Sequence, residues 1–388
     1  MTAAAVDAPA KADTKTPEPK ICDPKTPFMA WAPPLAGLAF VGALKAFGLD
    51  GGYDGSMASL VVSIALLPVL FGAVFAAVYH AELIAHRTGE PYGTLVLAMA
   101  VTVMEVALLA SAMLGADANP ALARDTIFAV VMIVGNGLVG LCILLGGLRH
   151  REQSFRITGA NAYLAVLMPL ATLSLVLPNF TVAAPGGAYS PSQLAFAGFA
   201  TLAIYLAFLY TQTVRNREYF AVVIEGDDVA DKAHVPSNRA TAISFGFLVA
   251  SLGVVILLSK TFTATVAVGL DAAGAPATVA GVIVAFLILL PEFSAAVRAA
   301  RANKLQKSVN LALGSACATI GLTIPAIAIV SLVYGAPLEL GLTPKDTVLL
   351  FITFAVALLT FGTGRTNILY GMIHLVLFAT YIFMVFSP

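Results

Sequence analysis

The chain has 388 residues, of which 59% are apolar and only 11% are charged, with 21 Lys and Arg balancing 21 Asp and Glu. Soluble proteins carry about 25% charged residues. The composition therefore excludes a soluble enzyme, a disordered chain and a nucleic-acid binder with a basic face, and it is typical of a polytopic membrane protein whose partner is the lipid bilayer.

The N-terminal segment differs from the rest of the chain. Residues 1–28 contain four lysines and five prolines and have no apolar run. The first apolar run that follows is long enough to span a membrane, so the segment does not resemble a cleaved signal peptide. We predict that 1–28 is a disordered cytoplasmic tail.

Eleven apolar runs follow this segment. A spanning helix needs about 20 predominantly apolar residues, so the sequence predicts an all-α membrane protein with about eleven transmembrane helices. The expected spans are 29–49, 57–79, 93–114, 126–147, 160–178, 192–211, 241–259, 276–297, 309–332, 347–362 and 367–386.

The distribution of basic residues predicts the orientation. With the N-terminus placed inside, the inside segments hold 17 of the 21 Lys and Arg, while the outside loops hold only three. Cytoplasmic loops of membrane proteins are enriched in Lys and Arg. The N-terminus is therefore expected in the cytoplasm and the C-terminus outside, which in a bacterial inner membrane is the periplasmic side.

The spans divide into two sets of five. The predicted organisation is an extra N-terminal helix within 29–56, a first five-helix repeat at 57–211, an acidic cytoplasmic linker at 212–240 and a second five-helix repeat at 241–388. A repeat with an odd number of spans must sit in the membrane in inverted orientation. Inverted repeats are common in secondary transporters, where the ion site lies between the repeats near the bilayer midplane.

Matching landmarks support this division. Each set has a Gly-x-Pro tripeptide, then a glutamate in its second span, then a Gly-polar pair in its third span. These landmarks are Gly89-Glu90-Pro91, Glu105 and Gly135-Asn136 in the first set, and Gly274-Ala275-Pro276, Glu292 and Gly314-Ser315 in the second.

Glu105 and Glu292 are the strongest functional signal. Most other acidic residues lie in loops or at span edges, whereas these two lie within spans, where a carboxylate is costly and usually marks an ion or proton path. Two nearby carboxylates repel each other, and either a cation or protons relieve the repulsion. We expect Glu105 and Glu292 to form a shared cation- and proton-binding site.

Neighbouring oxygens are candidates for further ligands. Ca²⁺ takes six to eight oxygen ligands, and Thr102, Ser315 and Asn136 are the candidates beside the two carboxylates. Thr319 and Thr323 continue a hydroxyl stripe from Ser315 at helical spacing, and ordinary hydrogen bonding within or between helices explains such hydroxyls equally well.

No enzyme signature accompanies these residues. Cys22, Cys142 and Cys317 form no CxxC pair, and the five histidines do not cluster at ligand spacing. HExxH and GxSxG motifs are absent. We therefore expect no cofactor and no enzyme activity; a cation channel is the remaining alternative, and it would conduct without moving protons.

Four stretches carry a family resemblance: VTVMEVALLASAML at 101–114, the glycine-rich stretch 135–155, the long stretch 289–332 and GTGRTNILYGMIHLV at 362–376. In these stretches the chain resembles the cation/Ca²⁺ exchanger superfamily, most closely the bacterial ChaA-type calcium/proton and sodium/proton antiporters. The resemblance implies a ten-helix inverted-repeat core with one extra N-terminal span.

The resemblance also implies site residues. It implies an acidic pair for Ca²⁺ and protons at Glu105 and Glu292, and a Gly-Ser element at Gly314-Ser315. Glu82 looks like a glutamate that eukaryotic relatives place before the first repeat motif.

The chain departs from the family pattern beside both acids. Relatives read GNAxE, whereas this chain reads VTVME and LLPE, so Thr102 and Leu289 replace the two asparagines, and Ala318 stands near the family's glutamine. Fewer oxygens then surround the ion. The expected function is an antiporter that exports Ca²⁺ for protons by alternating access, with Na⁺ or K⁺ as alternative cations.

Overall fold

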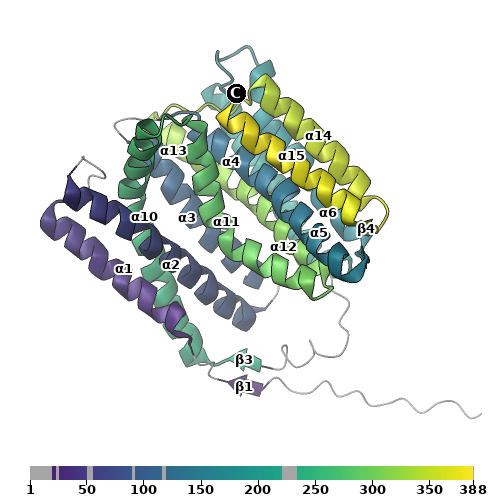
Figure 1. The fold of residues 1–388 in the computed structure, drawn as a ribbon, viewed down its shortest axis with the longest axis horizontal. Coiled ribbons are helices and arrows are strands. Elements are labelled where there is room, and N and C mark those ends of the chain that lie inside the picture. Colours follow the sequence, from purple (N-terminus) through teal and green to yellow (C-terminus); the bar gives the residue numbers. More distant parts are fainter. Residues whose placement is uncertain are drawn as a thin grey trace, which may run out of the picture.

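A computed structural model of the chain describes residues 20–22, 26–49, 56–89, 92–115, 119–220 and 234–387. These residues form an almost entirely helical bundle (Figure 1), and eleven of its helices are long and apolar enough to cross a membrane. The prediction of an all-α polytopic membrane protein with about eleven spans is confirmed.

The first six spans contain short π- and 3-10-helical segments, labelled η. The elements are α1 (Phe28–Phe47), α2 (Met57–Thr88), α3 (Tyr92–Met113), α4 (Leu122–Met132), η1 (Ile133–Leu138), α5 (Val139–His150), α6 (Ile157–Ala171), η2 (Thr172–Val176), η3 (Leu177–Phe180), α7 (Pro191–Tyr210), η4 (Thr211–Arg215) and α8 (Arg217–Phe220).

The last five spans are built in the same way. The elements are α10 (Asn238–Ala272), α11 (Thr278–Arg301), α12 (Leu305–Ala318), η5 (Thr319–Thr323), α13 (Ile324–Tyr334), α14 (Pro344–Phe361) and α15 (Ile368–Phe386). In both halves a π-helical turn interrupts the third span, at η1 and at η5.

Two helices are much longer than the sequence predicts. The spans expected at 57–79 and 241–259 belong to α2, with 32 residues, and α10, with 35 residues. Polar residues such as His80 and Lys260 end the apolar runs, but they do not break a helix. Hydropathy therefore locates the membrane-embedded part of these helices and not their ends.

Four short strands join segments that are distant in sequence. β1 (Lys20–Cys22) pairs in parallel with β3 (His234–Pro236), and β2 (Glu152–Ser154) pairs antiparallel with β4 (Arg365–Asn367). The segment 1–28 is predicted to be a disordered tail, but Lys20–Cys22 within it form the strand β1. The rest of that predicted tail up to residue 25, and residues 221–233 of the predicted linker, lie outside the described residues.

Contacts between the halves occur in exchanged pairs. α7 of the first half packs on α13, and α15 of the second half packs on α5 in the equivalent way. Helices α2 and α10, which begin the two halves, pack on each other.

β1 and the C-terminal end of α15 lie at opposite ends of the bundle (Figure 1), as an odd number of crossings requires. The exact boundaries at 57–211 and 241–388 stay a prediction, because the helical span containing residue 211 continues to Arg215.

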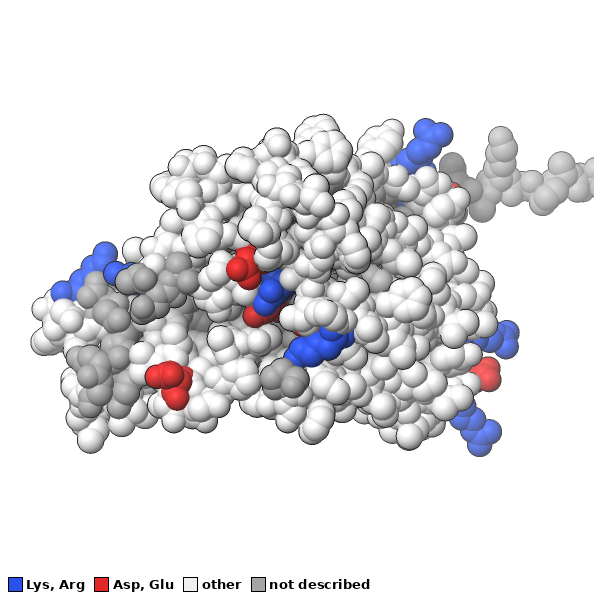
Figure 2. All heavy atoms as spheres, turned by 90° about the horizontal axis from the view of Figure 1, so that it is seen from above, with Lys and Arg blue, Asp and Glu red and all other residues white. Residues whose placement is uncertain are grey.

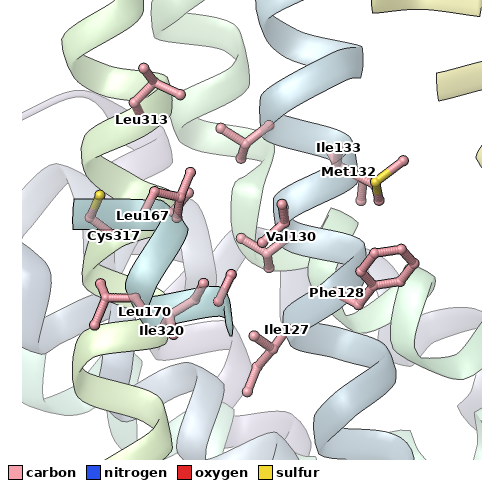
Figure 3. Packing of buried hydrophobic residues seen from close by; sticks show 14 of the residues in the cluster. Ile127, Phe128, Val130, Met132, Ile133, Leu167, Leu170, Leu313, Cys317 and Ile320 are labelled. Atoms are coloured by element: carbon pink, nitrogen blue, oxygen red, sulfur yellow. The ribbon is translucent and has the colours of Figure 1, made fainter. Parts of the chain in front are cut away.

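The third span of the first half occupies the centre of the molecule. In its most apolar 18-residue stretch, 89% of the residues are buried, the largest share among the spans found in the described residues. Figure 3 shows side chains of α4 and η1 facing Leu167 and Leu170 of α6 and Leu313, Cys317 and Ile320 of α12 and η5. A second apolar cluster joins α1, α2 and α10 to α3 and α11.

The outer surface is suited to lipid. Large apolar side chains are exposed along most helices, including Phe199 and Phe351, which are 70% and 75% exposed. Because lipid tails replace water around these apolar side chains, their exposure carries no penalty in a bilayer. Figure 2 looks instead onto one end of the bundle, where a few charged side chains lie among uncharged ones.

A glycine contact tests the packing of α15 against α5. A Cβ added at Gly371 would lie 2.7 Å from the backbone nitrogen of Leu144 and 2.9 Å from the carbonyl oxygen of Gly140, and neither backbone atom can move aside freely. We expect Gly371→Ala to destabilise the protein by about 1–3 kcal/mol, measured as a lower thermal unfolding midpoint in detergent. Gly246→Ala is the control, since no atom lies within 4 Å of its added Cβ; equal midpoints for the two variants would contradict the close packing.

Candidate functional site

Glu105 lies on α3 and is completely buried. Thr323, at the end of η5, donates a hydrogen bond of 2.8 Å from Oγ1 to Oε2 of Glu105. The side chain of Thr319, one turn earlier, acts on the same carboxylate. The other oxygen, Oε1, has no hydrogen-bond partner among the described residues. The carboxylate is thus fixed on one side and has an oxygen left for a ligand.

Glu292 lies on α11 and is half-buried. Its Oε2 atom also lacks a hydrogen-bond partner within the described ranges. The carboxylates of Glu82 and Glu105 both act electrostatically on Glu292. The two glutamates that the sequence singles out therefore lie within electrostatic reach of each other, on equivalent helices of the two halves.

A cavity of about 270 Å³ leads to Glu292. Its walls come from α3, α7 with η4, α11, α12 and η5. The polar lining residues are Thr94, Thr102, Tyr205, Gln212, Glu292, Lys307, Asn310, Ser315 and Thr319. Glu105, one turn beyond Thr102 on α3, is closed off from the cavity. One carboxylate thus faces the cavity while the other is enclosed behind it.

Four of the five predicted site residues meet in this region. Thr102, Glu292 and Ser315 line the cavity, and Glu105 lies behind it. Thr102 donates its hydroxyl hydrogen to the carbonyl of Ala98 at 2.9 Å, which leaves its oxygen lone pairs available as an acceptor. The available donors are carboxylate and hydroxyl oxygens, which hard cations such as Na⁺, K⁺ and Ca²⁺ prefer.

The structure does not bring Asn136 to this cavity. Asn136 is completely buried in η1, where its Nδ2 donates to Thr353 Oγ1 at 2.8 Å and its Oδ1 lies 3.0 Å from Nδ1 of His374. His374 in turn contacts the hydroxyl of Thr360 through Nε2 at 3.0 Å. Both ends of the amide are engaged in a network that ties η1 to α14 and α15.

Several polar residues of the cavity were not among the predicted site residues, and three of them lie toward its helix ends. Lys307 and Asn310 lie in the first turns of α12, and Gln212, in η4, hydrogen-bonds to the hydroxyl of Tyr163 at 2.8 Å. Lys307 lies eight residues before Ser315, on the backward continuation of its four-residue stripe, so extension of that pattern would have found it. Gln212 was assigned to the linker because it follows the last apolar residue of its span.

The equivalent place in the other half is closed. The cavity separates α3 from α12, and its counterpart is the contact between α11 and α4. There a Cβ added at Gly281 would lie 2.7 Å from the backbone of Asp125 and Thr126, and the two helices pack along much of their length. The protein is therefore open between one equivalent helix pair and closed between the other.

No group of three or more His, Cys, Asp and Glu side chains is placed to hold a metal ion in the described part of the chain. Cys142 and Cys317 are buried and free, and they lie in different spans. The acidic pair with its hydroxyl neighbours is the candidate ion site.

Comparison with known proteins gives the same family twice along the chain. The family described as sodium/calcium exchanger protein matches residues 58–214 and 243–387. The two matched segments are close in extent to the two predicted five-helix repeats, and the division into repeats stays a prediction.

Individual relatives cover nearly the whole chain. The chain is 44% identical over 364 residues to the putative ionic transporter y4hA of Sinorhizobium fredii (strain NBRC 101917 / NGR234), covering 93% of this chain and 97% of that protein. It is 37% identical over 332 residues to the sodium-potassium/proton antiporter ChaA of Escherichia coli (strain K12), covering 84% and 90%.

A solved structure shares the fold. Native YfkE, a Ca²⁺/H⁺ antiporter, superposes with a TM-score of 0.69 at 18% sequence identity, covering 92% of this chain and 99% of that chain. At this identity the likeness concerns the fold alone. Members of the matched family are ion exchangers and not enzymes, and the match spans both halves of this molecule. The chain is a multi-pass membrane protein that belongs to the sodium/calcium exchanger family.

Proposed function

We propose that the protein is a cation/proton antiporter that exports Ca²⁺ from the cytoplasm in exchange for protons, with Glu105 and Glu292 as the shared binding site. The observation that carries the proposal is the pair itself. Two carboxylates, one enclosed and one facing a cavity, interact electrostatically, and each has an oxygen without a hydrogen-bond partner among the described residues.

Competition at one site accounts for the exchange. When both carboxylates are ionised in a low-dielectric region they repel each other, and a divalent cation between them removes this repulsion. Protonation of the carboxylates does the same. Cation and protons therefore bind in mutually exclusive fashion, which is the requirement for antiport at a single site.

The oxygens of the site suffice for a hard cation. The two carboxylates supply up to four oxygens, and the hydroxyls of Thr102, Ser315 and Thr319 face the same cavity. Water from the cavity completes the six to eight ligands that Ca²⁺ takes. Asn136 is left out of this set because both ends of its amide are already hydrogen-bonded.

The closed and open helix pairs support alternating access. Lys307, Gln212 and Asn310, which line the cavity, belong to helix ends that the Lys and Arg distribution predicts on the cytoplasmic side. The state described here is then open to the cytoplasm and closed outside at Gly281 and Asp125. Opening of the α4–α11 pair and closure of the α3–α12 pair gives the opposite state. The proposed location is a bacterial inner membrane, with the N-terminus cytoplasmic.

Monovalent cations are the second candidate. The 37% identical relative carries the name sodium-potassium/proton antiporter. In addition, Thr102 and Leu289 stand where the resembled family has asparagines, which removes two amide oxygens from the site. Exchange of Na⁺ or K⁺ for protons uses the same two glutamates and the same cavity.

Charge-neutralising variants test the site. In everted membrane vesicles with an imposed pH gradient, addition of Ca²⁺ should release protons from vesicles containing the wild-type protein, and Glu105→Gln and Glu292→Gln should each abolish this release. Glutamine keeps the shape of the side chain but has neither the charge nor the proton site. Glu152→Gln, an exposed residue of β2, is the control that should retain the release.

The same measurement separates the alternatives. Separate additions of Ca²⁺, Na⁺, K⁺ and Mg²⁺ rank the cations, and proton release by Na⁺ or K⁺ but not by Ca²⁺ favours the second candidate. A cation channel would dissipate a cation gradient without coupled proton movement. Wild-type proton release in either glutamine variant, at normal expression, would refute the assignment of that glutamate.

Substitution of Thr323 tests whether its hydrogen bond to Glu105 supports cation binding. Thr323→Val has nearly the same shape but removes the hydroxyl that donates to Glu105 Oε2. Hydrogen bonds to charged groups contribute about 1.5–3 kcal/mol, so we expect the KM for the transported cation to rise by about tenfold or more. Thr323→Ser keeps a donor and should restore most of the affinity. An unchanged KM in the valine variant would show that this hydroxyl does not support the ion-binding carboxylate.

A further inference from the structure

The end of the bundle that is predicted to face outside holds a cluster of titratable side chains separate from the acidic pair. Arg124 and Asp125 lie in the first turn of α4, Asp346 lies in the first turn of α14, and Tyr381 lies near the C-terminal end of α15. Figure 2 looks onto this end, and acidic and basic side chains meet near the middle of the face. The cluster adjoins the closed contact between α4 and α11, because Gly281 packs on Asp125.

The hydroxyl of Tyr381 is a buried polar group without a partner. The residue is 1% exposed, and its hydroxyl oxygen has no hydrogen-bond partner among the described residues. The carboxylates of Asp346 and Asp125 both act electrostatically on this hydroxyl. The ring packs edge-on against Phe128, one turn after Asp125 on α4, with ring centroids 5.4 Å apart. Burial of a hydroxyl without a hydrogen bond costs free energy, so a hydroxyl kept in this place near two carboxylates indicates a function.

The two carboxylates differ in their access to outside water. Asp346 is half-buried, and its Oδ2 accepts a hydrogen bond of 2.6 Å from the hydroxyl of Thr343. Asp125 is only 6% exposed, and its Oδ1 accepts a hydrogen bond of 2.8 Å from Nε of Arg124. Outside water therefore reaches Asp346 more readily than Asp125, and the hydroxyl of Tyr381 lies within electrostatic reach of both.

The other charged groups at this end are placed differently. Glu339 acts electrostatically on Asp125, and its Oε2 lies 3.9 Å from Nη1 of Arg124. Lys345 donates to the carbonyl oxygen of Met384 at 2.7 Å. The parts of α3 and α11 nearest this end contribute no titratable side chain, since none occurs in 106–115 or 278–291. Asp125 therefore has one basic partner, Arg124, and a second acid, Glu339, that acts on it from outside the Tyr381 contact.

The inverted repeat places Asp125 on the route that should open to the outside. Asp125 lies eight residues before Ile133, the first residue of η1, and Leu311 lies eight residues before Thr319, the first residue of η5. Leu311 lines the cytoplasmic cavity. The position equivalent to Asp125 thus faces the cavity that is open in this state. When the α4–α11 pair opens instead, we expect Asp125 to face the outer cavity.

Tyr381 is equivalent to a cavity residue as well. Phe378 of α15 packs on a glycine of η1, as Tyr205 of α7 packs on a glycine of η5. Three residues after these contacts lie Tyr381 and Phe208, and Phe208 lines the cytoplasmic cavity together with Tyr205. Tyr381 and Asp125 therefore belong to the two walls that should line an outer cavity.

We propose that Asp346, the hydroxyl of Tyr381 and Asp125 form a proton relay from the outside toward the acidic pair. The inference rests on the proposed antiport function. A proton from outside water binds to the carboxylate of Asp346. Asp346 donates this proton to the oxygen of Tyr381, while the O–H of Tyr381 donates its own hydrogen to the carboxylate of Asp125. One proton moves inward, Asp346 is again ionised, Asp125 is neutral and Tyr381 keeps its hydroxyl. Chains of ionisable side chains carry protons in this way in pumps and transporters.

Asp125 passes the proton to the path along α11. Gly281, which packs on Asp125, precedes Glu292 by eleven residues, which is about 16 Å along a helix. A proton crosses such a distance through water, and the opening of the α4–α11 pair admits water. The relay therefore supplies protons at the outer end of the path, and Glu292 receives them at its inner end.

Tyr381→Phe gives the first test. The change removes only a hydroxyl that has no partner among the described residues, so no hydrogen bond between them is lost. In everted vesicles the outer end faces the lumen, and lumenal protons must enter through it. We expect the variant to slow cation-driven proton release about tenfold or more. Exchange of radiolabelled for unlabelled cation, which moves no proton, should keep its wild-type rate.

Asp125→Asn should show the same separation of the two rates. Glu339→Gln is the matched control, because it removes a carboxylate from the same end of the bundle but not from the relay, and it should retain both rates. The KM for the cation on the cytoplasmic side should be unchanged in all three variants, since the cation enters through the cavity on that side. The probe is Ca²⁺, or Na⁺ or K⁺ where the wild-type protein exchanges only that ion.

The outcomes separate the relay from the proposed function. Wild-type proton release in either Tyr381→Phe or Asp125→Asn would overturn the relay. Equal loss of proton release and of cation–cation exchange would also overturn it, because it would show that these side chains only support the structure. Absence of exchange in the wild-type protein with Ca²⁺, Na⁺ and K⁺ alike would instead refute the antiport function itself.

Discussion

The structure depends on the free-energy cost of placing a charged carboxylate inside a membrane protein. Glu105 is completely enclosed and Glu292 is half-buried, and no Lys or Arg forms an ion pair with either of them in the described ranges. An unpaired charge at such a place is costly by several kcal/mol. The compensating charge must therefore come from a bound cation or from protons. A site that is unfavourable when empty exchanges one ligand for the other, and this property couples the two fluxes in the proposed antiporter.

The two halves have the same order of helices, but the surroundings of their glutamates differ. Glu105 is fixed by hydroxyls of the opposite half and shut off from the cavity, whereas Glu292 faces it. The difference follows from the unequal packing of the α3–α12 and α4–α11 pairs. If the halves exchange conformations, the accessible and the enclosed carboxylate exchange roles as well. An inverted repeat then needs only two packings of one unit to expose its site to both sides.

The sequence predicts the number of spans and the acidic pair, because both depend on local hydrophobicity and on a charge within an apolar run. It does not predict the place of Asn136, since its partners Thr353 and His374 lie more than two hundred residues away. The ends of α2 and α10 are missed for a related reason. Hydropathy reports the surrounding solvent, and helical hydrogen bonding continues beyond the hydrocarbon region.

The hydroxyl stripe of η5 explains why two hydroxyls reach one carboxylate. Residues four apart lie on one face of a helix, so Thr319 and Thr323, the first and last residues of η5, both act on Glu105. The π-helical turn between them widens the backbone. Pro325, two residues after η5, has no N–H to give Gly321, so the local sequence favours a departure from α-helical bonding here. The backbone irregularity thus lies directly beside the candidate ion site.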